Sequence, residues 1–381
     1  MTVSYWQDKS GTQTLTCDVC VIGAGIVGAY TAKCLCEAGA TVVLVEARHV
    51  AAGATGRNAG MVLTGLAAYY HEAVAQYGPA AAREVWELTL ANRARMFALA
   101  AEYGVPWEQQ GALVLALDAA EADALEQTAQ ALAAAGLPGQ FTRSDPTGRG
   151  FTAALVQPDD GATHPAQLTE ALVAASGAHL LENSEVFALQ PTADGMEVRS
   201  RLATIRCRRV AICTNAYAPL LHPYFADLVV PTRGQVLVTA PVAAGVLDRP
   251  CYADWGYEYF RQLPDGAVLI GGWRQHFRAA EVGYEDRVTT GVQGGLAGFL
   301  LRYFPELRGV PITHRWSGVM GFSRDHIPLV GLLPDLPRVG FAVGFTGHGL
   351  GWGLQTAERL VALLLHGQSA GLLDARRARK T

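Results

Sequence analysis

The sequence predicts a two-domain α/β protein (α+β overall), in which a Rossmann-like parallel sheet accompanies a second, largely antiparallel sheet. Three observations lead to this prediction. The chain has 381 residues, which suits two cores better than one, because a domain holds roughly 100–200 residues. A β-α-β pattern occupies residues 17–46, and parallel strands need such a crossover. From Val229 onward the pattern changes to short strands and tight turns.

The first half of the chain alternates between strand and helix patterns. Residues before about 15 are expected to form an arm. The opening unit then gives a buried strand at Cys17–Ile22, a turn at Gly23–Gly28, a helix at Ile26–Ala38 and a second buried strand at Thr41–Glu46. Further helices are expected at Ala80–Tyr103, Ala119–Ala135 and His164–Ala175, strands at Gly111–Leu117, Val186–Gln190, Met196–Ser200 and Arg208–Thr214, and a connection at Gln140–Gly150. His164 is expected to initiate its helix, with Pro165 at the first helical position.

The sequence pattern of the second half predicts mainly strands. Val229–Thr239 is one strand, and Tyr257–Leu263 with Ala267–Trp273 form a hairpin joined by Pro264-Asp265-Gly266, a strong turn signal. Strands return after about Pro311, including Val339–Phe345. A last helix is expected at Gly349–His366, followed by a basic tail at Ala375–Thr381.

Composition excludes several classes of protein. A net charge of −4, with 17% charged residues, does not suit a basic nucleic-acid binder. Apolar stretches end well before the ~18 residues of a membrane span, and no leader pattern opens the chain. The seven cysteines are odd in number and scattered, which argues against a disulfide framework and favours a cytoplasmic location. No His or Cys set has the spacing of metal ligands, so no metal site is expected.

Two residue counts are unusual. Glycine makes up 42 of 381 residues, about 11% against a typical ~7%, so the backbone turns tightly or approaches something closely at many places. Lysine is nearly absent. Only Lys9, Lys33 and Lys380 occur, so residues 34–379 hold no lysine.

The turn Gly23-Ala24-Gly25-Ile26-Val27-Gly28 is a G-x-G-x-x-G fingerprint between a strand and a helix. Glu46 ends the next strand, 18 residues beyond Gly28, close to the ~20 expected of the acid that binds a ribose diol. Gly23 allows the turn, Gly25 lets the backbone approach a pyrophosphate, and Gly28 lets the helix lie close on the sheet. The fingerprint indicates a dinucleotide, and a nicotinamide-dependent dehydrogenase stays open as an alternative.

Two further glycine-rich loops favour a flavin. Residues 53–60 follow the second strand and can offer several backbone amides to an anion or a ring edge. Residues 344–351 lie between a strand and the last helix, so their amides form a second positive pole. A flat ring held between two such poles suits a flavin.

These motifs together resemble those of the D-amino-acid oxidase-like (DAO) family of FAD-dependent oxidoreductases, and most closely its γ-glutamylputrescine oxidase, glycine oxidase and sarcosine oxidase group. The resemblance spans nearly the whole chain. It rests on Gly23–Gly28 with Glu46, residues 54–60, His164-Pro165, residues 214–217, Gly271-Gly272, Trp316-Ser317-Gly318, residues 325–331 and Gly344–Gly349.

The resemblance implies a discontinuous FAD-binding domain of the GR2 type at 1–76, 146–219 and 312–381, with a substrate domain at 77–145 and 220–311. It implies FAD as the cofactor. The residues expected to bind it are Gly23, Gly25, Ile26, Gly28, Glu46, Ala47, Gly56, Arg57, Asn58, Ala59, Gly60, Met61, Val186, Thr214, Asn215, Gly318, Gly344, Thr346, Gly347, His348, Gly349 and Leu350.

Departures from the family pattern add two expectations. Relatives that attach FAD covalently use a cysteine seven residues before the equivalent of Asp325, where this chain has Gly318, or a histidine in the N-terminal loop, where it has Arg57 and Asn58. We therefore expect non-covalent FAD. Sarcosine oxidase-like enzymes also use lysines for the substrate carboxylate and for oxygen, and this chain has Gly351 at the first of these places. A positive charge near the flavin would then come from His348 or an arginine.

The implied reaction is oxidation of the C–N bond of a small amine or amino acid. Hydride passes from the α-carbon to flavin N5, the imine hydrolyses, and O2 is reduced to H2O2. The alternatives are a flavin dehydrogenase that passes electrons to a quinone or other carrier, and a non-catalytic flavoprotein subunit. The substrate, its chirality and the oligomeric state are not readable from the sequence.

The candidate catalytic residues are Tyr259, Arg261 and His348, and Tyr257 on the same predicted hairpin is a candidate substrate-binding residue. Tyr257, Tyr259 and Arg261 alternate along one strand and share a face, so Arg261 is expected either to grip a carboxylate or to lie at a sheet edge. His348 is expected beside the flavin, with helix capping as the alternative. The expected pocket walls and anchors, with core packing or an ion pair as alternatives, are Tyr252, Trp273 and Arg315.

Overall fold

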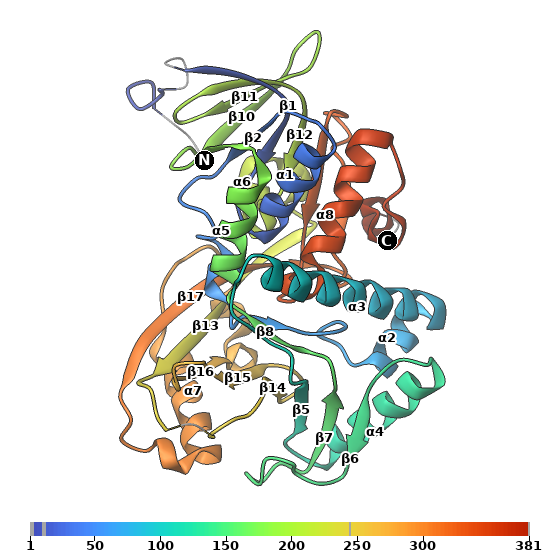
Figure 1. The fold of residues 1–381 in the computed structure, drawn as a ribbon, viewed down its shortest axis with the longest axis vertical. Coiled ribbons are helices and arrows are strands. Elements are labelled where there is room, and N and C mark those ends of the chain that lie inside the picture. The colour runs from blue at the N-terminus through green and yellow to red at the C-terminus, as the bar shows by residue number, and fades with distance from the viewer. Residues whose placement is uncertain (1–3, 10–12, 244, 380–381) are drawn as a thin grey trace.

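The computed structural model describes residues 4–9, 13–243 and 245–379, and it has two large sheets with helices packed on both (Figure 1). The predicted arm and basic tail lie partly outside these residues. Within these described residues, the eight α-helices are α1 (Ile26–Glu37), α2 (Tyr70–Tyr77), α3 (Pro79–Glu102), α4 (Ala119–Ala134), α5 (Pro165–Ser176), α6 (Ala218–Leu221), α7 (Thr290–Tyr303) and α8 (Gly349–His366). Among the described residues, none of these helices is long and apolar enough to cross a membrane.

The first sheet contains the predicted parallel unit. Its strands follow the order β10 (Val186–Pro191), β11 (Met196–Ser200), β12 (Thr204–Ile212), β1 (Thr14–Ile22), β2 (Val42–Val45) and β9 (His179–Leu181). β19 (Val339–Val343) pairs with β12 and with β18 (Leu329–Leu332). The pairs β1–β2, β1–β12, β2–β9 and β12–β19 are parallel. The residues of β2 and β19 are all buried, and β1 and β12 are buried toward their carboxyl ends, as expected of the central part of a parallel sheet covered on both faces.

The second sheet is mostly antiparallel and lies below the first in Figure 1. Its order is β17 (Ile312–Ser323), β13 (Val229–Thr239), β16 (Val268–Gly272), β15 (Glu258–Gln262), β14 (Cys251–Ala253), β5 (Ala112–Ala116), β7 (Ala153–Gln157) and β6 (Gln140–Thr142). A small third sheet joins β3 (Met61–Val62), β8 (Gly161–Thr163) and β4 (Trp107–Glu108). The mixed α/β prediction is thereby confirmed, and Gln140–Thr142, expected to be a connection, is an edge strand.

Strand pairing does not follow the predicted domain ranges throughout. β7 lies within 146–219 and β17 within 312–381, yet both belong to the second sheet. Those ranges were expected to serve the cofactor domain, so the chain passes between the two sheets more often than the sequence indicates. The domain boundaries themselves remain a prediction.

Local signals set several helix ends as expected. His164 precedes α5 and accepts a hydrogen bond through Nδ1 from the Gln167 amide at 3.2 Å, so the prediction that it initiates this helix is confirmed. Asp118 caps α4 by accepting from the Glu121 amide at 2.9 Å. Gly177 and Gly367 end α5 and α8 in the left-handed conformation.

Helix α7 is absent from the predicted elements because four glycines disfavour a helix by propensity. Packing explains two of them. A Cβ on Gly295 would lie 1.9 Å from Trp273 Nε1, and one on Gly291 would lie 2.6 Å from the Phe277 ring. These glycines allow the helix to approach the residues that follow β16.

Candidate active site

A cleft of about 570 Å³ lies between the two large sheets and takes lining residues from both. On the first sheet it meets the carboxyl ends of β1, β2 and β12, where open parallel sheets bind their ligands. Its size is in the range of small-molecule and cofactor sites, roughly 300–1,000 Å³.

The fingerprint turn holds α1 against the end of β1. Gly23 has φ +101°, and a Cβ there would lie 2.8 Å from the Cys213 carbonyl oxygen. A Cβ on Gly28 would lie 1.8 Å from the Gly23 oxygen. Larger residues would push the helix away from the sheet, so both glycines are required by the close approach.

Glu46 closes the same end of the cleft from β2. Its Oε2 accepts from the Ala24 amide and its Oε1 from the Arg48 amide, each at 2.9 Å. Each carboxylate oxygen keeps a second acceptor position. The carboxylate thus fixes the turn and can still accept from hydroxyl groups in the cleft.

Two helix N-termini meet at the cleft. α1 begins after Gly25 and α8 after His348, neither N-cap residue caps its helix with a side chain, and both ends line the cleft. The Ile26 amide of α1 donates to Thr55 Oγ1 at 3.1 Å. The remaining amides and the helix dipole give each end a partial positive charge. The cleft therefore offers two positive poles, one for a phosphate and one for an electron-rich ring edge.

Asparagine side chains hold the loops around the cleft in shape. Asn58 donates to the carbonyls of Ala54 and Thr55 at 3.0 and 2.7 Å and accepts from the Gly60 amide. Asn215 has φ +45° and accepts from the Gly344 amide at 3.0 Å. The protein's own hydrogen bonds thus fix the loop at residues 54–60 and join the loops at Asn215 and Gly344.

Arg57 connects its loop to the second sheet. Its Nη1 donates to Asp286 and to the Ser317 carbonyl, each at 2.8 Å, and Nε donates to the Ala52 carbonyl at 3.1 Å. Arg57 lines the cleft as predicted, but its guanidinium is already bonded to protein groups.

The second sheet forms an aromatic wall. Tyr259 and Tyr252 project from β15 and β14 with ring centroids 6.2 Å apart, and the His348 ring lies 6.0 Å from that of Tyr252. Gly271 makes room for this wall, because a Cβ there would lie 2.3 Å from the Tyr259 ring.

The wall is uncharged at neutral pH. Burial raises the pKa of Tyr252 and raises the pKa of Tyr259 to about 12. Burial lowers the pKa of His348 to about 4, against a hydrogen bond to the Thr346 carbonyl and with Arg274 as a further lowering influence. His348 is therefore neutral, and the positive charge considered for it must come from an arginine.

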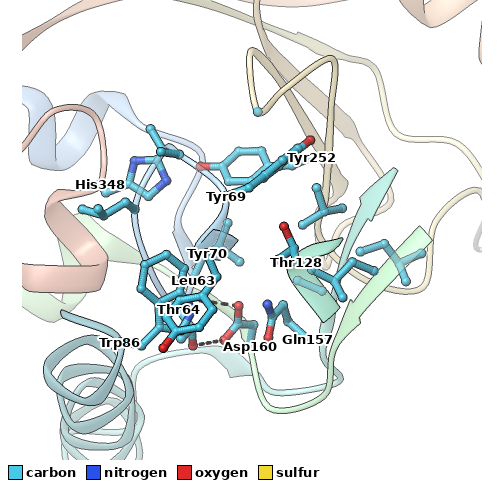
Figure 2. A pocket seen from close by; sticks show the side chains of 18 residues that line it. Leu63, Thr64, Tyr69, Tyr70, Trp86, Thr128, Gln157, Asp160, Tyr252 and His348 are labelled. Carbon is cyan, nitrogen blue, oxygen red and sulfur yellow. Dashed lines mark hydrogen bonds between the residues drawn. The ribbon is translucent and has the colours of Figure 1, made fainter. Parts of the chain in front are cut away.

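A smaller chamber of about 50 Å³ opens from the cleft, with which it shares Tyr252 and His348 (Figure 2). Its walls combine aliphatic side chains with a few aromatic ones, and its floor is polar. There Asp160 accepts from Thr64 Oγ1 at 2.6 Å and from Arg93 Nη1 at 2.8 Å. The chamber has room for ordered water or a small substituent.

The structure brings most of the predicted cofactor residues together. All of them line the cleft except Gly28, Gly56, Gly60 and Gly344. Of the predicted catalytic and substrate residues, those that line the cleft are Tyr252, Tyr257, Tyr259 and His348.

Three predicted residues do not line the cleft. Arg261 is 5% exposed, and its guanidinium lies behind Gly60, with Nε and Nη1 lacking partners among the described residues. Trp273 packs on α7 at Gly295. Arg315 is exposed and donates to Gln293 Oε1 at 2.6 Å. These positions favour core packing for Trp273 and a structural bond for Arg315.

Sequence reasoning missed Arg274, which lines the cleft from the short 3₁₀ helix Arg274–His276. The preceding Trp273 has φ +61°, a conformation that bulky residues rarely adopt, and it turns the chain back toward the cleft. No sequence signal predicts this turn, so Arg274 could not be placed. Phe322 and Met320 of β17 also line the cleft. The sequence did not identify them, because it does not show how β17 pairs with its neighbouring strand.

A buried carboxyl fixes the segment around Arg274. Glu258 Oε1 accepts from the Trp273 amide at 3.2 Å and from Gln275 Nε2 at 2.7 Å. Burial, with the nearby carboxylate of Asp254, raises the pKa of Glu258 to about 8, against the hydrogen bond from Gln275. Glu258 is fully buried, so it holds a proton at neutral pH.

Comparison with known proteins gives a consistent result. The model of the DAO family, FAD dependent oxidoreductase, matches residues 18–363. The chain is 27% identical to gamma-glutamylputrescine oxidoreductase of Escherichia coli K12, across 94% of this chain and 85% of that one. It is 25% identical to glycine oxidase of Geobacillus kaustophilus, across 87% and 89%.

Solved structures share the fold. The crystal structure of that glycine oxidase superposes with a TM-score of 0.79, at 23% identity, over 93% of this chain and 96% of that one. L-proline dehydrogenase from P. horikoshii gives 0.80, at 22% identity, over 96% and 99%.

The residues present fit FAD. The cleft runs from Glu46 and Val186 to the aromatic wall and meets both uncapped helix ends. Thr214 Oγ1 is buried at the cleft without a hydrogen-bond partner among the described residues, which leaves it available to a bound group. Among the same residues, no cluster of three or more His, Cys, Asp or Glu could hold a metal.

We expect Glu46→Gln to weaken FAD binding roughly ten- to hundred-fold, because a hydrogen bond to a charged acceptor contributes about 1.5–3 kcal/mol. Equilibrium dialysis of the apoprotein with FAD measures the change. Glu37→Gln makes the same chemical change at the exposed far end of α1 and serves as the control. Equal affinities for E46Q and E37Q would contradict the assignment.

We expect the FAD to be non-covalent, because Gly318, Arg57 and Asn58 occupy the places from which relatives attach it. Heat or acid precipitation of the purified protein should release the yellow colour into the supernatant. Colour that stays with the pellet after washing in denaturant would mean a covalent bond.

We expect Glu258→Gln to reduce the pH dependence of stability. Between about pH 4.5 and 8 the folded protein keeps a proton on Glu258 that the unfolded chain releases, so stability falls as pH rises through this window. Urea unfolding at about pH 5, 6.5 and 8 measures the slope, which E258Q should flatten. The exposed Glu170→Gln is the control, and equal slopes for E258Q and wild type would reject the shift.

Proposed function

The chain belongs to the DAO family of FAD-dependent oxidoreductases, and on that premise we propose that it oxidises the carbon–nitrogen bond of a small amine or amino acid. The product is an imine, which water hydrolyses to a carbonyl compound and an amine or ammonia. Two relatives support this substrate class, since their names are gamma-glutamylputrescine oxidoreductase and glycine oxidase.

The observation that carries the proposal is the uncharged wall opposite the two helix N-termini. Tyr252, Tyr259 and His348 present aromatic rings to the cleft, and none of them is charged at neutral pH. An amine is oxidised in its neutral form. A wall without a carboxylate favours that form, because it offers no counter-ion to an ammonium.

FAD supplies the two-electron acceptor when it is bound. The candidate FAD-binding residues are those that line the cleft from the first sheet together with the N-terminus of α8. Tyr252, Tyr257 and Tyr259 bind and orient the substrate through their rings and hydroxyl groups, and the closed wall excludes water from the reacting bond. Neutral His348, with Nδ1 directed at the Thr346 carbonyl, leaves Nε2 able to accept a hydrogen bond from the amine.

Arg261 was expected to act in catalysis, and its buried position supports a different contribution. Its guanidinium lies behind Gly60, next to the loop that borders the cleft. From there it can raise the electrostatic potential of the site without touching a substrate.

We propose O2 as the electron acceptor, with H2O2 as its product. No lysine lies between residues 34 and 379, so any cation that assists oxygen must be an arginine. The competing acceptor is a quinone or protein carrier, and one structural neighbour is named as a dehydrogenase.

Anaerobic titration of the purified holoprotein with a panel of amines and amino acids tests the proposed reaction. At least one member should bleach the visible flavin absorbance, since the reduced flavin loses its colour. A flavin that stays oxidised with every member, yet is bleached by dithionite, would contradict the proposed substrate class.

Readmission of air to the reduced protein then identifies the acceptor. An oxidase should regain its colour within seconds and form one H2O2 for each flavin reoxidised. Slow recolouring, with fast electron transfer to a quinone analogue, would make the protein a dehydrogenase.

A further inference from the structure

The small chamber beside the cleft contains a buried amide without a hydrogen-bond partner. Gln157 of β7 lines the chamber and is 7% exposed, and its Oε1 is buried without a partner among the described residues. Figure 2 shows its amide directed into the chamber, at the end away from Tyr252 and His348. A buried polar atom left unpaired costs about 1–3 kcal/mol, so a bound group or a water is expected to bond there.

Trp86 adds a second unused polar group to the lining. It is 4% exposed, and its Nε1 is buried without a partner in the part of the chain that the structure describes. The other polar side chains of the chamber floor are already bonded. Thr64 donates to Asp160 at 2.6 Å, and Thr128 Oγ1 lies 2.8 Å from His71 Nδ1. The unused hydrogen-bonding capacity therefore comes from an amide, which both donates and accepts, and from an indole N–H.

The charges near the chamber are compensated by the protein. Asp160 pairs with Arg93 at 2.8 Å and also accepts from the Thr64 amide at 3.0 Å. A second buried carboxyl, that of Glu121, accepts from the Tyr69 hydroxyl at 2.8 Å and does not line the chamber. A charged ligand end would lose its water here without meeting a free counter-ion, which makes an uncharged end favourable.

The size and shape of the chamber suit the end of a short chain. Its volume of about 50 Å³ holds about three to five water-sized groups, since each takes roughly 10–15 Å³ of such space. Its mouth lies at Tyr252 and His348, which also line the cleft, and aliphatic side chains such as Val114 and Leu155 form the walls. A methylene chain can pass these walls and bring a polar end to the floor.

The polar floor is held in place from several segments. The Gly111 amide donates to the Asp160 carbonyl at 2.9 Å, and the Asp160 carboxylate binds Thr64. Gln157 is paired with Ala112 in the ladder between β5 and β7. The backbone under Gln157 is therefore fixed, although the end of its side chain has no partner. A polar group positioned in this way is expected at a binding site.

We propose that the chamber binds the far end of the substrate's side chain, and that this end is a small uncharged group that both donates and accepts hydrogen bonds, such as a carboxamide. The inference rests on the proposed function and deepens it. The reacting carbon–nitrogen bond stays at the aromatic wall, and the side chain extends past Tyr252 and His348. Gln157 then exchanges hydrogen bonds with the carboxamide, and Trp86 is the second available donor.

Three non-reacting probes of one shape test the proposal without turnover. Propanamide, propanoate and propanamidine have the same number of non-hydrogen atoms and a planar end, and they are neutral, negative and positive. None has a hydrogen on the carbon that bears nitrogen or oxygen, so the flavin cannot oxidise that carbon. Ligand-detected NMR with the oxidised holoprotein measures their affinities. Wild type should bind propanamide saturably.

Variants then assign the binding to the chamber. Gln157→Leu should weaken propanamide binding about 3- to 10-fold and leave the two charged probes unchanged. Ala68→Leu fills part of the chamber, leaves Gln157 in place, and should also weaken propanamide binding. Gln140→Leu makes the same change as Q157L at an exposed position on the neighbouring strand β6 and should bind like wild type. FAD content and the apparent Tm are compared for every variant, so that loss of folding is not mistaken for loss of the site.

Several results would overturn the proposed subsite. Wild type that binds no propanamide would do so, and so would equal propanamide affinity in wild type and either Q157L or A68L. An equal or larger effect of Q157L on a charged probe would show that the chamber does not select an uncharged end.

Failure of this inference is distinguishable from failure of the proposed function. In the anaerobic titration, 4-aminobutanamide or glutamine should bleach the flavin at lower concentrations than the matched carboxylates (4-aminobutanoate, glutamate) and diamines (1,4-diaminobutane, ornithine). Flavin bleached preferentially by a charged member would overturn the subsite, and the proposed oxidation would stand. Flavin that no amine bleaches, with propanamide binding weakened only in Q157L and A68L, would refute the oxidation and leave the subsite.

Discussion

The architecture depends on bringing two uncapped helix N-termini to one cleft. The α1 terminus is held by the fit between Gly23, Gly28 and the Cys213 carbonyl, where no side chain can be added. The α8 terminus arrives because β19 pairs with β12 beside β1, and because α8 packs on α1. Segments more than 300 residues apart in the sequence thus supply the two positive poles. If either helix shifted away from the cleft, its N-terminal amides could no longer contact a group bound there. The loops between the two helices would then no longer border a binding site.

The charged groups around the cleft follow one pattern, in which most of them are bonded to other protein groups. Most charged groups near the cleft are bonded to protein: Glu46 to two amides, and Arg57 to Asp286 and Ser317. The aromatic wall is neutral because burial removes the charged forms of its tyrosines and of His348. Two arginines differ: aromatic rings hold Arg274, Arg261 is buried behind Gly60, and neither has a carboxylate partner among the described residues. The second sheet's side of the cleft therefore carries two guanidinium groups that no carboxylate neutralises.

The sequence predicted the residues of the cofactor loops more completely than those of the substrate wall, and the difference has a physical reason. Fingerprint glycines, capping residues and the Gly349–His366 helix carry local signals, because the constraint and the residue that meets it are neighbours. The alternation that puts Tyr259 and Arg261 on one face of β15 is also local. Which of them reaches the cleft depends on how far the loop at Gly60 covers the strand, a contact between residues about 200 positions apart. Sequence reasoning likewise could not decide between the alternatives for Trp273 and Arg315 and did not single out Arg274, because the positive φ of Trp273 and the register of β17 appear only in the folded chain.

The scarcity of lysine bears on how such a site can be built. A lysine ammonium is strongly hydrated and carries its charge at a point, so burying it without a carboxylate is costly, and its pKa falls readily. A guanidinium is more weakly hydrated and planar, and it can be held by the faces of Tyr257 and Phe322 while its edge stays open. The protonated Glu258, which accepts a hydrogen bond from the Trp273 amide, holds in place the segment that carries this guanidinium. In this fold, the unpaired guanidinium at the cleft and the segment braced by a neutral carboxyl are therefore two parts of one arrangement, and a lysine in place of Arg274 would keep the charge but lose the planar geometry that stacks on the two rings.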